Sequence, residues 1–127
     1  MTEQQIAARS GLELAFIGDA VYELFIREHL VAKAPSTVGV LQQASSAYAR
    51  AGQQCEAYWR LEPLLTEPEK AVFLRGRNAK PKSIPKSASP GEYAAATGFE
   101  AVIGYLYLLG ETERLEYLLS EVHHEQL

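Results

Sequence analysis

The fold is decided by the stretch Gly11-Leu-Glu-Leu-Ala-Phe-Ile-Gly-Asp19-Ala-Val-Tyr-Glu-Leu-Phe-Ile26, an apolar run with Asp19 near its middle. A second stretch of the same design reads Tyr93-Ala-Ala-Ala-Thr-Gly-Phe-Glu100-Ala-Val-Ile-Gly-Tyr-Leu-Tyr-Leu-Leu109. Both are predicted to be helices that are apolar over most of their surface, so we expect them at the centre of a bundle. A buried carboxylate without a partner is costly. The two acids therefore suggest a shared partner, and a divalent cation with oxygen ligands is the simplest one.

The composition is typical of one globular domain. The chain has 127 residues, of which 47% are hydrophobic and 22% charged. Strand signals are nearly absent, whereas apolar residues recur at helical spacing almost everywhere, so we predict an all-α bundle. Other helices are expected over about 37–45, 47–61, 67–75 and 111–122, with an irregular loop over 76–90 that contains three prolines. We expect Tyr58 and Trp59 to pack in the core or between helices rather than to form a platform on which bases stack.

Charge is distributed unevenly along the chain. The net charge is −4, yet the segment from Arg75 to Lys86 has five basic residues and no acid. This asymmetry indicates a basic loop with a binding role and a solvated acidic C-terminal helix. Cys55 is the single cysteine, and the N-terminus lacks the pattern of a signal peptide, so we expect a cytoplasmic protein.

Asp19 and Glu100 have structural alternatives. Asp19 could be hydrogen-bonded to a neighbour, and Glu100 could pair with a buried Arg or Lys. The two central helices offer only Arg27 as a base, which weakens the ion-pair alternative for both acids. Glycines near the acids would allow close approach of another group or helix: Gly18, Gly98 and Gly104.

Two motifs resemble the ribonuclease III catalytic domain. Leu14-Ala-Phe-Ile-Gly-Asp-Ala-Val-Tyr-Glu-Leu24 resembles that family's signature helix, and Ala96-Thr-Gly-Phe-Glu-Ala-Val-Ile-Gly-Tyr-Leu-Tyr107 resembles its second acidic helix. The similarity covers roughly residues 12–119 and is closest to Mini-ribonuclease III, the short bacterial branch without a double-stranded RNA-binding domain. We therefore expect residues 1–127 to form a single, homodimeric ribonuclease III-type helical domain.

The resemblance implies an Mg²⁺-dependent endoribonuclease that cleaves double-stranded RNA. Asp19 and Glu100 match the family's catalytic acids and would be the metal ligands. Phe16 matches the aromatic that, in larger relatives, enters a socket on the partner subunit; its alternative is an ordinary core residue. The substrate in this branch is precursor large-subunit (23S) ribosomal RNA. Whether a ribosomal protein presents the RNA stays open.

The chain departs from the larger enzymes at three positions. They carry further acids where this chain has Leu12, Ala15 and Thr97. The number of metal ions therefore stays open, as does a supporting role for Glu23 or Thr97. Fewer carboxylates leave more water around the metal, which suits Mg²⁺.

The basic loop is the predicted RNA-binding element. A-form RNA is recognised mostly by shape through phosphates and 2′-hydroxyls, which cations and amides can contact. The expected RNA-binding residues are Arg75, Arg77, Asn78, Lys80, Lys82 and Lys86. Two alternatives keep the scaffold without the catalysis: a structured-RNA-binding module, and an interaction scaffold whose acids are structural. A helical metal or oxidoreductase bundle is disfavoured because the usual pair of Glu-x-x-His motifs, one on each of two helices, is missing.

Overall fold

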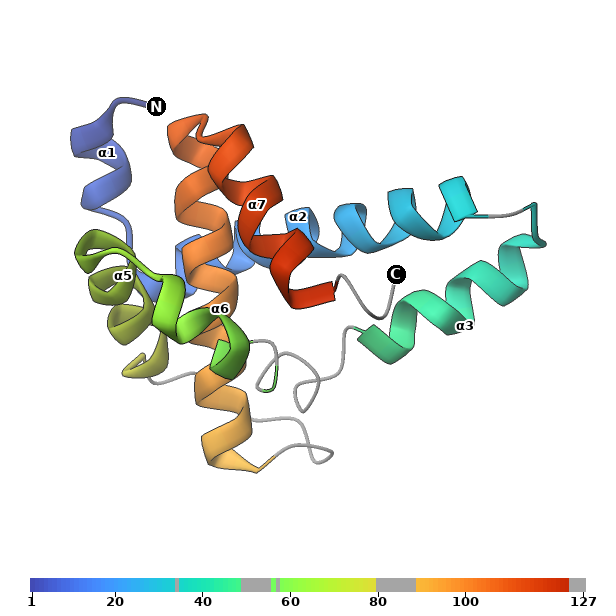
Figure 1. Cartoon of the computed structure of the whole chain (residues 1–127). Helices are drawn as coiled ribbons and strands as arrows, with labels where there is room; N and C mark the ends of the chain where they lie inside the picture. The colour runs from blue at the N-terminus through green and yellow to red at the C-terminus, as the bar shows by residue number, and fades with distance from the viewer. Residues whose placement is uncertain (34, 49–55, 57, 80–88, 124–127) are drawn as a thin grey trace.

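The computed structural model describes residues 1–33, 35–48, 56, 58–79 and 89–123. These residues form α1 (Glu3–Ala7), α2 (Gly11–Lys33), α3 (Val38–Tyr48), the 3₁₀ turn η1 (Glu62–Leu64), α5 (Glu67–Arg77), α6 (Pro90–Leu109) and α7 (Thr112–His123) (Figure 1). No strand occurs in the described part of the chain. The all-α prediction is confirmed.

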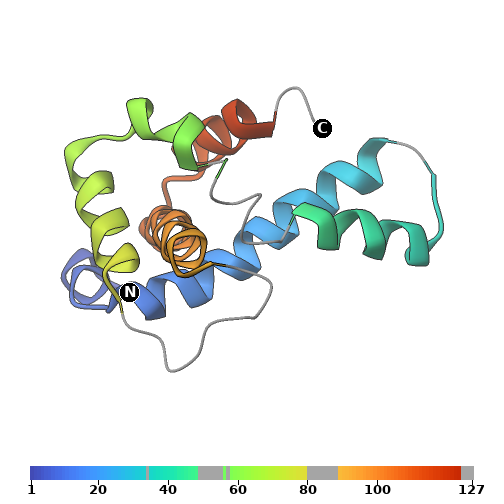
Figure 2. The same cartoon turned by 90° about the horizontal axis from the view of Figure 1, so that it is seen from below.

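The core is built where α6 crosses α2. Figures 1 and 2 show the two helices running steeply across each other, with α1, α5 and α7 around α6. Nearly every residue of α6 from Ala95 to Leu106 is buried. Tyr22 of α2 and Phe99 of α6 meet edge to face, with ring centroids 5.3 Å apart. The central position predicted for α6 is therefore confirmed.

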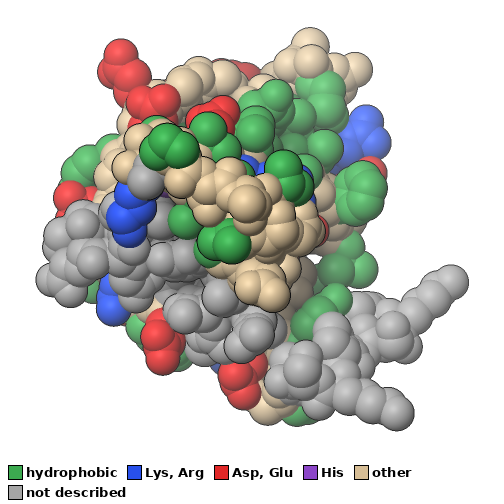
Figure 3. Space-filling view, turned by 90° about the vertical axis from the view of Figure 1, so that its right-hand side faces the viewer, with side chains coloured by type: hydrophobic (Ala, Val, Ile, Leu, Met, Phe, Trp, Pro, Cys, Tyr) green, Lys and Arg blue, Asp and Glu red, His purple; other side chains and the backbone are tan. Residues whose placement is uncertain are grey.

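The second half of α2 is less central than predicted. Beyond Ile26 the helix extends away from the body and runs beside α3 (Figure 1), so that α6 no longer covers it. Figure 3 faces this end of the molecule and shows hydrophobic side chains at its surface. The exposed apolar side chains on these two helices include Leu24, Val31, Val38 and Val40. An apolar sequence shows that a helix can be buried, but not which of its turns a neighbour reaches.

The helix boundaries follow local capping signals. The sequence Thr66-Glu-Pro-Glu69 has the spacing of a capping box, and Thr66 and Glu69 do form one at the start of α5, with Pro68 in the first turn. Gly110 ends α6 in the left-handed conformation (φ 77°), as the sequence predicts. Helix α5 continues two residues beyond the predicted end at Arg75, and its C-cap is Asn78.

One helix was not predicted. Thr2 and Gln5 form a capping box that begins α1, and Ile6 of this short helix is buried. Arg75 holds α1 in place by donating a 2.7 Å hydrogen bond from Nη1 to the carbonyl oxygen of Ala7. The helix is only five residues long, too short to show an apolar period.

Of the neighbouring aromatics Tyr58 and Trp59, only Tyr58 is buried in the core. Tyr58 is 8% exposed and belongs to the core, whereas Trp59 is 63% exposed. Consecutive helical residues point about 100° apart, so one can be buried while the next faces solvent. Most of the helix predicted over 47–61, with Cys55, lies outside the described residues; α3 reaches Tyr48. No helix in the described part could cross a membrane.

Candidate active site

Helices α2 and α6 touch through their backbones where they cross. A Cβ atom on Gly18 would lie 1.7 Å from the carbonyl oxygen of Glu100, and one on Gly104 would lie 1.9 Å from that of Leu14. Real Cβ atoms essentially never approach closer than 3.0 Å. Only glycine fits at both positions. The predicted close approach at Gly18 and Gly104 is confirmed, and the group that approaches Gly18 is α6 itself.

This crossing brings the two predicted acids onto adjoining turns. Asp19 is the next residue after Gly18, whose backbone touches the carbonyl oxygen of Glu100. The two acids are thus brought near the same crossing although they are far apart in the sequence. Asp19 is exposed, and no hydrogen bond or ion pair joins it to another described residue. Glu100 is half-buried. Asp19 is therefore available to a ligand approaching the crossing.

The two candidate helpers are already engaged. Arg27 donates a 2.5 Å hydrogen bond from Nη2 to Oε1 of Glu23. Thr97 is buried and donates its hydroxyl hydrogen to the carbonyl oxygen of Tyr93, at 2.9 Å. Arg27, the basic residue that could have paired with Asp19 or Glu100, thus pairs with Glu23. The Thr97 hydroxyl is hydrogen-bonded within its own helix.

The donor set at the crossing fits a hard cation with a water-rich shell. Among the described residues, no three His, Cys, Asp or Glu side chains are grouped so that they could hold a metal. A zinc-like site with three or four protein ligands is therefore not formed by them. One or two carboxylates with several waters is the shell that Mg²⁺ commonly takes. Asp19 and Glu100 carry carboxylate oxygens, the type of ligand that such an ion takes.

The described part of the predicted RNA-binding set lies at the C-terminal end of α5. Arg77 and Asn78 are exposed there, and Arg75 is exposed despite its bond to Ala7. A Cβ on Gly76 would lie 2.8 Å from the Gly98 Cα atom and 2.9 Å from the Thr97 carbonyl oxygen. Backbone contact therefore holds this end of α5 against the turn of α6 just before Glu100. Lys80, Lys82 and Lys86 lie outside the described residues.

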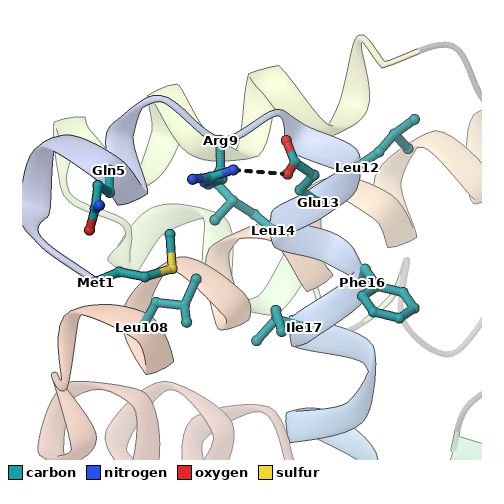
Figure 4. Close-up of a pocket in the computed structure, with 9 residues that line it drawn as sticks. All are labelled: Met1, Gln5, Arg9, Leu12, Glu13, Leu14, Phe16, Ile17 and Leu108. Carbon is teal, nitrogen blue, oxygen red and sulfur yellow. Dashed lines mark hydrogen bonds and ion pairs between the residues drawn. The ribbon is translucent and has the colours of Figure 1, made fainter.

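Phe16 is on the surface and not in the core. It is 80% exposed, and Leu12, one turn earlier on the same side of α2, is 38% exposed. Both line a groove of about 520 Å³ that Met1, Ile17 and Leu108 also border (Figure 4). Asp19 follows Phe16 by three residues, so the acid and the exposed apolar residues share one side of α2.

A second groove was not anticipated. It has a volume of about 730 Å³ and lies between Trp59, α5 and the first turns of α6. Trp59, expected in the core or between helices, is its most exposed apolar wall. No sequence signal distinguishes such a tryptophan from a buried one.

Comparison with known proteins identifies the family. The Ribonuclease III domain family matches residues 12–111. The chain is 50% identical over 109 residues to "Mini-ribonuclease 3" of Symbiobacterium thermophilum, covering 86% of this chain and 84% of that one. It is 45% identical over 120 residues to "Mini-ribonuclease 3" of a Thermoanaerobacter species, covering 94% and 84% of the two chains.

A solved structure agrees with the sequence relatives. The crystal structure of a protein from Fusobacterium nucleatum superposes with a TM-score of 0.86 at 34% identity, covering 94% of this chain and 96% of that one. The matched family range spans both halves of the crossing, Gly18 with Asp19 and Glu100 with Gly104. The chain therefore belongs to the ribonuclease III domain family and is an endoribonuclease.

Proposed function

We propose that the chain is a homodimeric, Mg²⁺-dependent endoribonuclease that cleaves double-stranded RNA at a site formed by Asp19 and Glu100. The observation that carries this proposal is the backbone contact between Gly18 and the Glu100 carbonyl. It holds one exposed and one half-buried carboxylate at a single crossing. The family match provides the reaction class.

Each acid has a distinct part in the proposal. Asp19 faces solvent and is able to meet an arriving ion together with the scissile phosphate. Glu100 lies on the helix that the core holds most firmly, between the buried residues Phe99 and Ala101. A bound Mg²⁺ would polarise the phosphate and lower the pKa of water. The protein's part is to fix the two carboxylates and so set where the ion and the phosphate meet.

Duplex RNA would lie across the end of α5. Arg77 and Asn78 are exposed beside the α6 turn that precedes Glu100, and Arg75 is close by in sequence. Cations and amides at such a place can contact phosphates and 2′-hydroxyls without reading bases. We assign the same role to Lys80, Lys82 and Lys86. Since the chain has a net charge of −4, binding should weaken steeply with salt.

The exposed side of α2 would be covered by a second copy of the chain. Phe16 and Leu12 are exposed side by side on α2 and border an apolar groove of about 520 Å³, and contiguous exposed apolar surface of this kind marks interaction sites. A two-fold arrangement places the same surface on both subunits, so each Phe16 would enter the other's groove. Asp19 shares this side of α2, and the two sites would flank the interface.

The substrate we propose is precursor 23S ribosomal RNA. This choice comes from the Mini-ribonuclease III branch, whose curated members match most of this chain. Its duplex ends would be cut on both strands by the two sites of a dimer. The proposal includes no ribosomal protein, because neither the family match nor the described residues point to one.

The test is cleavage of a long RNA duplex with Mg²⁺ or with EDTA. Wild type, Asp19→Asn, Glu100→Gln and the control Glu116→Gln would be compared; Glu116 is an exposed acid on α7. Losing a metal ligand removes several kcal/mol of transition-state stabilisation, which is roughly 10³-fold in rate. We expect that loss in the first two variants, no cleavage in EDTA, and wild-type cleavage in the control.

Two outcomes would contradict the proposal. Equal cleavage by all four proteins would remove the catalytic assignment of the acids. Duplex binding without Mg²⁺-dependent cleavage by the wild type would instead indicate a non-catalytic RNA-binding module. Circular dichroism of each variant would establish that a lost activity does not reflect a lost fold.

A further inference from the structure

The groove beside α5 has an aromatic wall on a rigid base. Tyr58 is buried and stacks face to face on Phe73 of α5, with ring centroids 3.6 Å apart and planes within 2°. Trp59 leans on Tyr58 at 5.2 Å and 59°, and 63% of it is open to solvent. A tryptophan held in place at the surface offers a large flat face at little cost in side-chain entropy.

The groove also has positive charge within reach of that face. Arg77 and Lys70 line it together with Trp59, and Glu62 is its one acid among the described residues. Arg77 makes no hydrogen bond or ion pair with the described part of the chain, and Lys70 has only a 3.8 Å contact to the exposed Glu67. Burial raises the pKa of Tyr58, the charge of Glu62 raises it further and the charge of Arg77 lowers it. Both charges therefore act on the Tyr58 hydroxyl group. On a chain of net charge −4, this local excess of cations suits an anionic ligand.

These features distinguish the groove from a site for duplex RNA. In a duplex the bases are stacked on each other and only phosphates and groove edges are accessible. An exposed aromatic face beside cations is the arrangement that binds unpaired nucleotides, with a base on the ring and phosphates on the cations. The volume of about 730 Å³ is within the usual range for a bound small ligand and can hold a nucleotide.

We propose that this groove binds an unpaired nucleotide of the RNA substrate, with its base on Trp59 and its phosphate on Arg77 and Lys70. Glu62 accepts a hydrogen bond from the base or the ribose. The inference rests on the proposed function, which it deepens: the enzyme prefers a duplex that continues into a single strand over a blunt duplex. The groove is a specificity site and takes no part in the chemical step.

The single tryptophan of the chain makes a direct test possible, because all tryptophan emission comes from Trp59. Full-length protein carrying Asp19→Asn would be titrated without added Mg²⁺ with a blunt RNA duplex and with the same duplex extended by unpaired nucleotides at either end. We expect the extended duplex to quench the emission and to bind about tenfold more tightly, since stacking contributes this much per base.

Variants separate stacking from mere surface contact. Trp59→Ala should lose the preference for the extension, Trp59→Phe should keep most of it, and Lys70→Ala, which removes the cation of the groove that has no part in the proposed duplex contact, should weaken it. Tyr117→Ala, which removes an exposed aromatic of α7, should change nothing. Affinity would be followed by the anisotropy of labelled RNA.

The result that overturns the inference is equal affinity for the blunt and extended duplexes with unchanged Trp59 emission; a groove that serves a protein partner would give this outcome. A failure of the proposed function looks different, because wild type with Mg²⁺ would then leave the blunt duplex uncut. The two experiments can therefore fail separately.

Discussion

The backbone of Gly18 lies against the carbonyl oxygen of Glu100, at a distance that leaves no room for even a methyl group. Helices usually meet through side chains, with axes 8–10 Å apart. Here a glycine on each helix removes that layer. The separation between the turns that carry Asp19 and Glu100 is consequently set by peptide groups, which cannot adopt another rotamer.

Gly18→Ala should therefore damage both folding and catalysis. The new Cβ would lie 1.7 Å from the Glu100 oxygen, so α2 and α6 must move apart. Overpacking of this kind costs about 3 kcal/mol or more. Urea unfolding should show the loss, and duplex cleavage should fall even where the variant is still folded. Gly39→Ala is the matched control, because nothing lies within 4 Å of its added Cβ and it should be neutral or slightly stabilising. A Gly18→Ala protein with wild-type stability and activity would refute the backbone contact.

Phe16→Ala should weaken the proposed homodimer. The ring is 80% exposed in one copy, and burying it in the partner's groove would make it an interface anchor. Truncating such an anchor costs about 2 kcal/mol or more, which is roughly a 30-fold rise in the dimer dissociation constant. Sedimentation at several protein concentrations measures this constant. Tyr117→Ala serves as the control, since Tyr117 does not border the groove. Unchanged dimerisation of the Phe16 variant would place the interface elsewhere.

Arg75→Ala and Arg77→Ala should differ in stability but share an effect on RNA binding. Arg75 holds the Ala7 carbonyl, so its loss should cost about 1 kcal/mol of folding free energy. Arg77 has no such bond to the described residues, and its loss should leave the unfolding midpoint unchanged. Each variant should reduce the slope of log affinity against log salt by about one. Equal stabilities, or an unaltered salt slope in both proteins, would contradict this division.

The pair formed by Glu69 and Arg114 should make stability depend on acid pH. Burial raises the pKa of Glu69, but hydrogen bonds from Arg114 and Thr66 lower it by more, so the net shift is downward. Arg114 donates from Nε to Oε2 at 3.0 Å and from Nη2 to Oε1 at 2.9 Å, joining α7 to α5. When the pKa of a carboxyl is lower in the folded chain than its unfolded value of about 4.3, the carboxyl contributes its full stabilising free energy at pH values above about 4.3. Its contribution is lost as the pH falls through the folded pKa.

Glu69→Gln should accordingly cost about 2 kcal/mol near neutral pH and flatten the acid limb of the stability curve. Glu67→Gln is the control, because the Glu67 side chain is 90% exposed and its contact with Lys70 is long. Chemical unfolding at a series of pH values from acid to neutral would measure the free energy of unfolding of both variants. A Glu69 variant with the wild-type pH profile would show that the pair does not set it.

The helices could be predicted from the sequence, because their signals are local. Apolar spacing located α2 and α6, the Thr66 capping box began α5, and Gly110 ended α6. The α1 helix had a capping box as well, at Thr2, but its single turn gave no periodic signal beside it. Long-range partners had no such signal: Arg114 is 45 residues from Glu69, and only the fold brings them together.

The site could be predicted in part. The motifs around Asp19 and Glu100 indicated which acids to consider, and the glycines indicated a close approach. Periodicity could not show that α6 supplies that approach, that Arg27 pairs with Glu23, or that Trp59 faces a groove. Each of these depends on which helix covers which side, and that is settled by packing between distant segments.

The peptide-to-peptide crossing also restricts how the enzyme can adapt to heat or cold. Most proteins tune their interiors by adding or removing methyl groups, each a small step in stability. At Gly18 and Gly104 no small step exists, because the first added carbon already collides. A change that adapts the protein to another temperature is therefore easier at peripheral features, such as helix caps and the Glu69–Arg114 link, than at these two glycines.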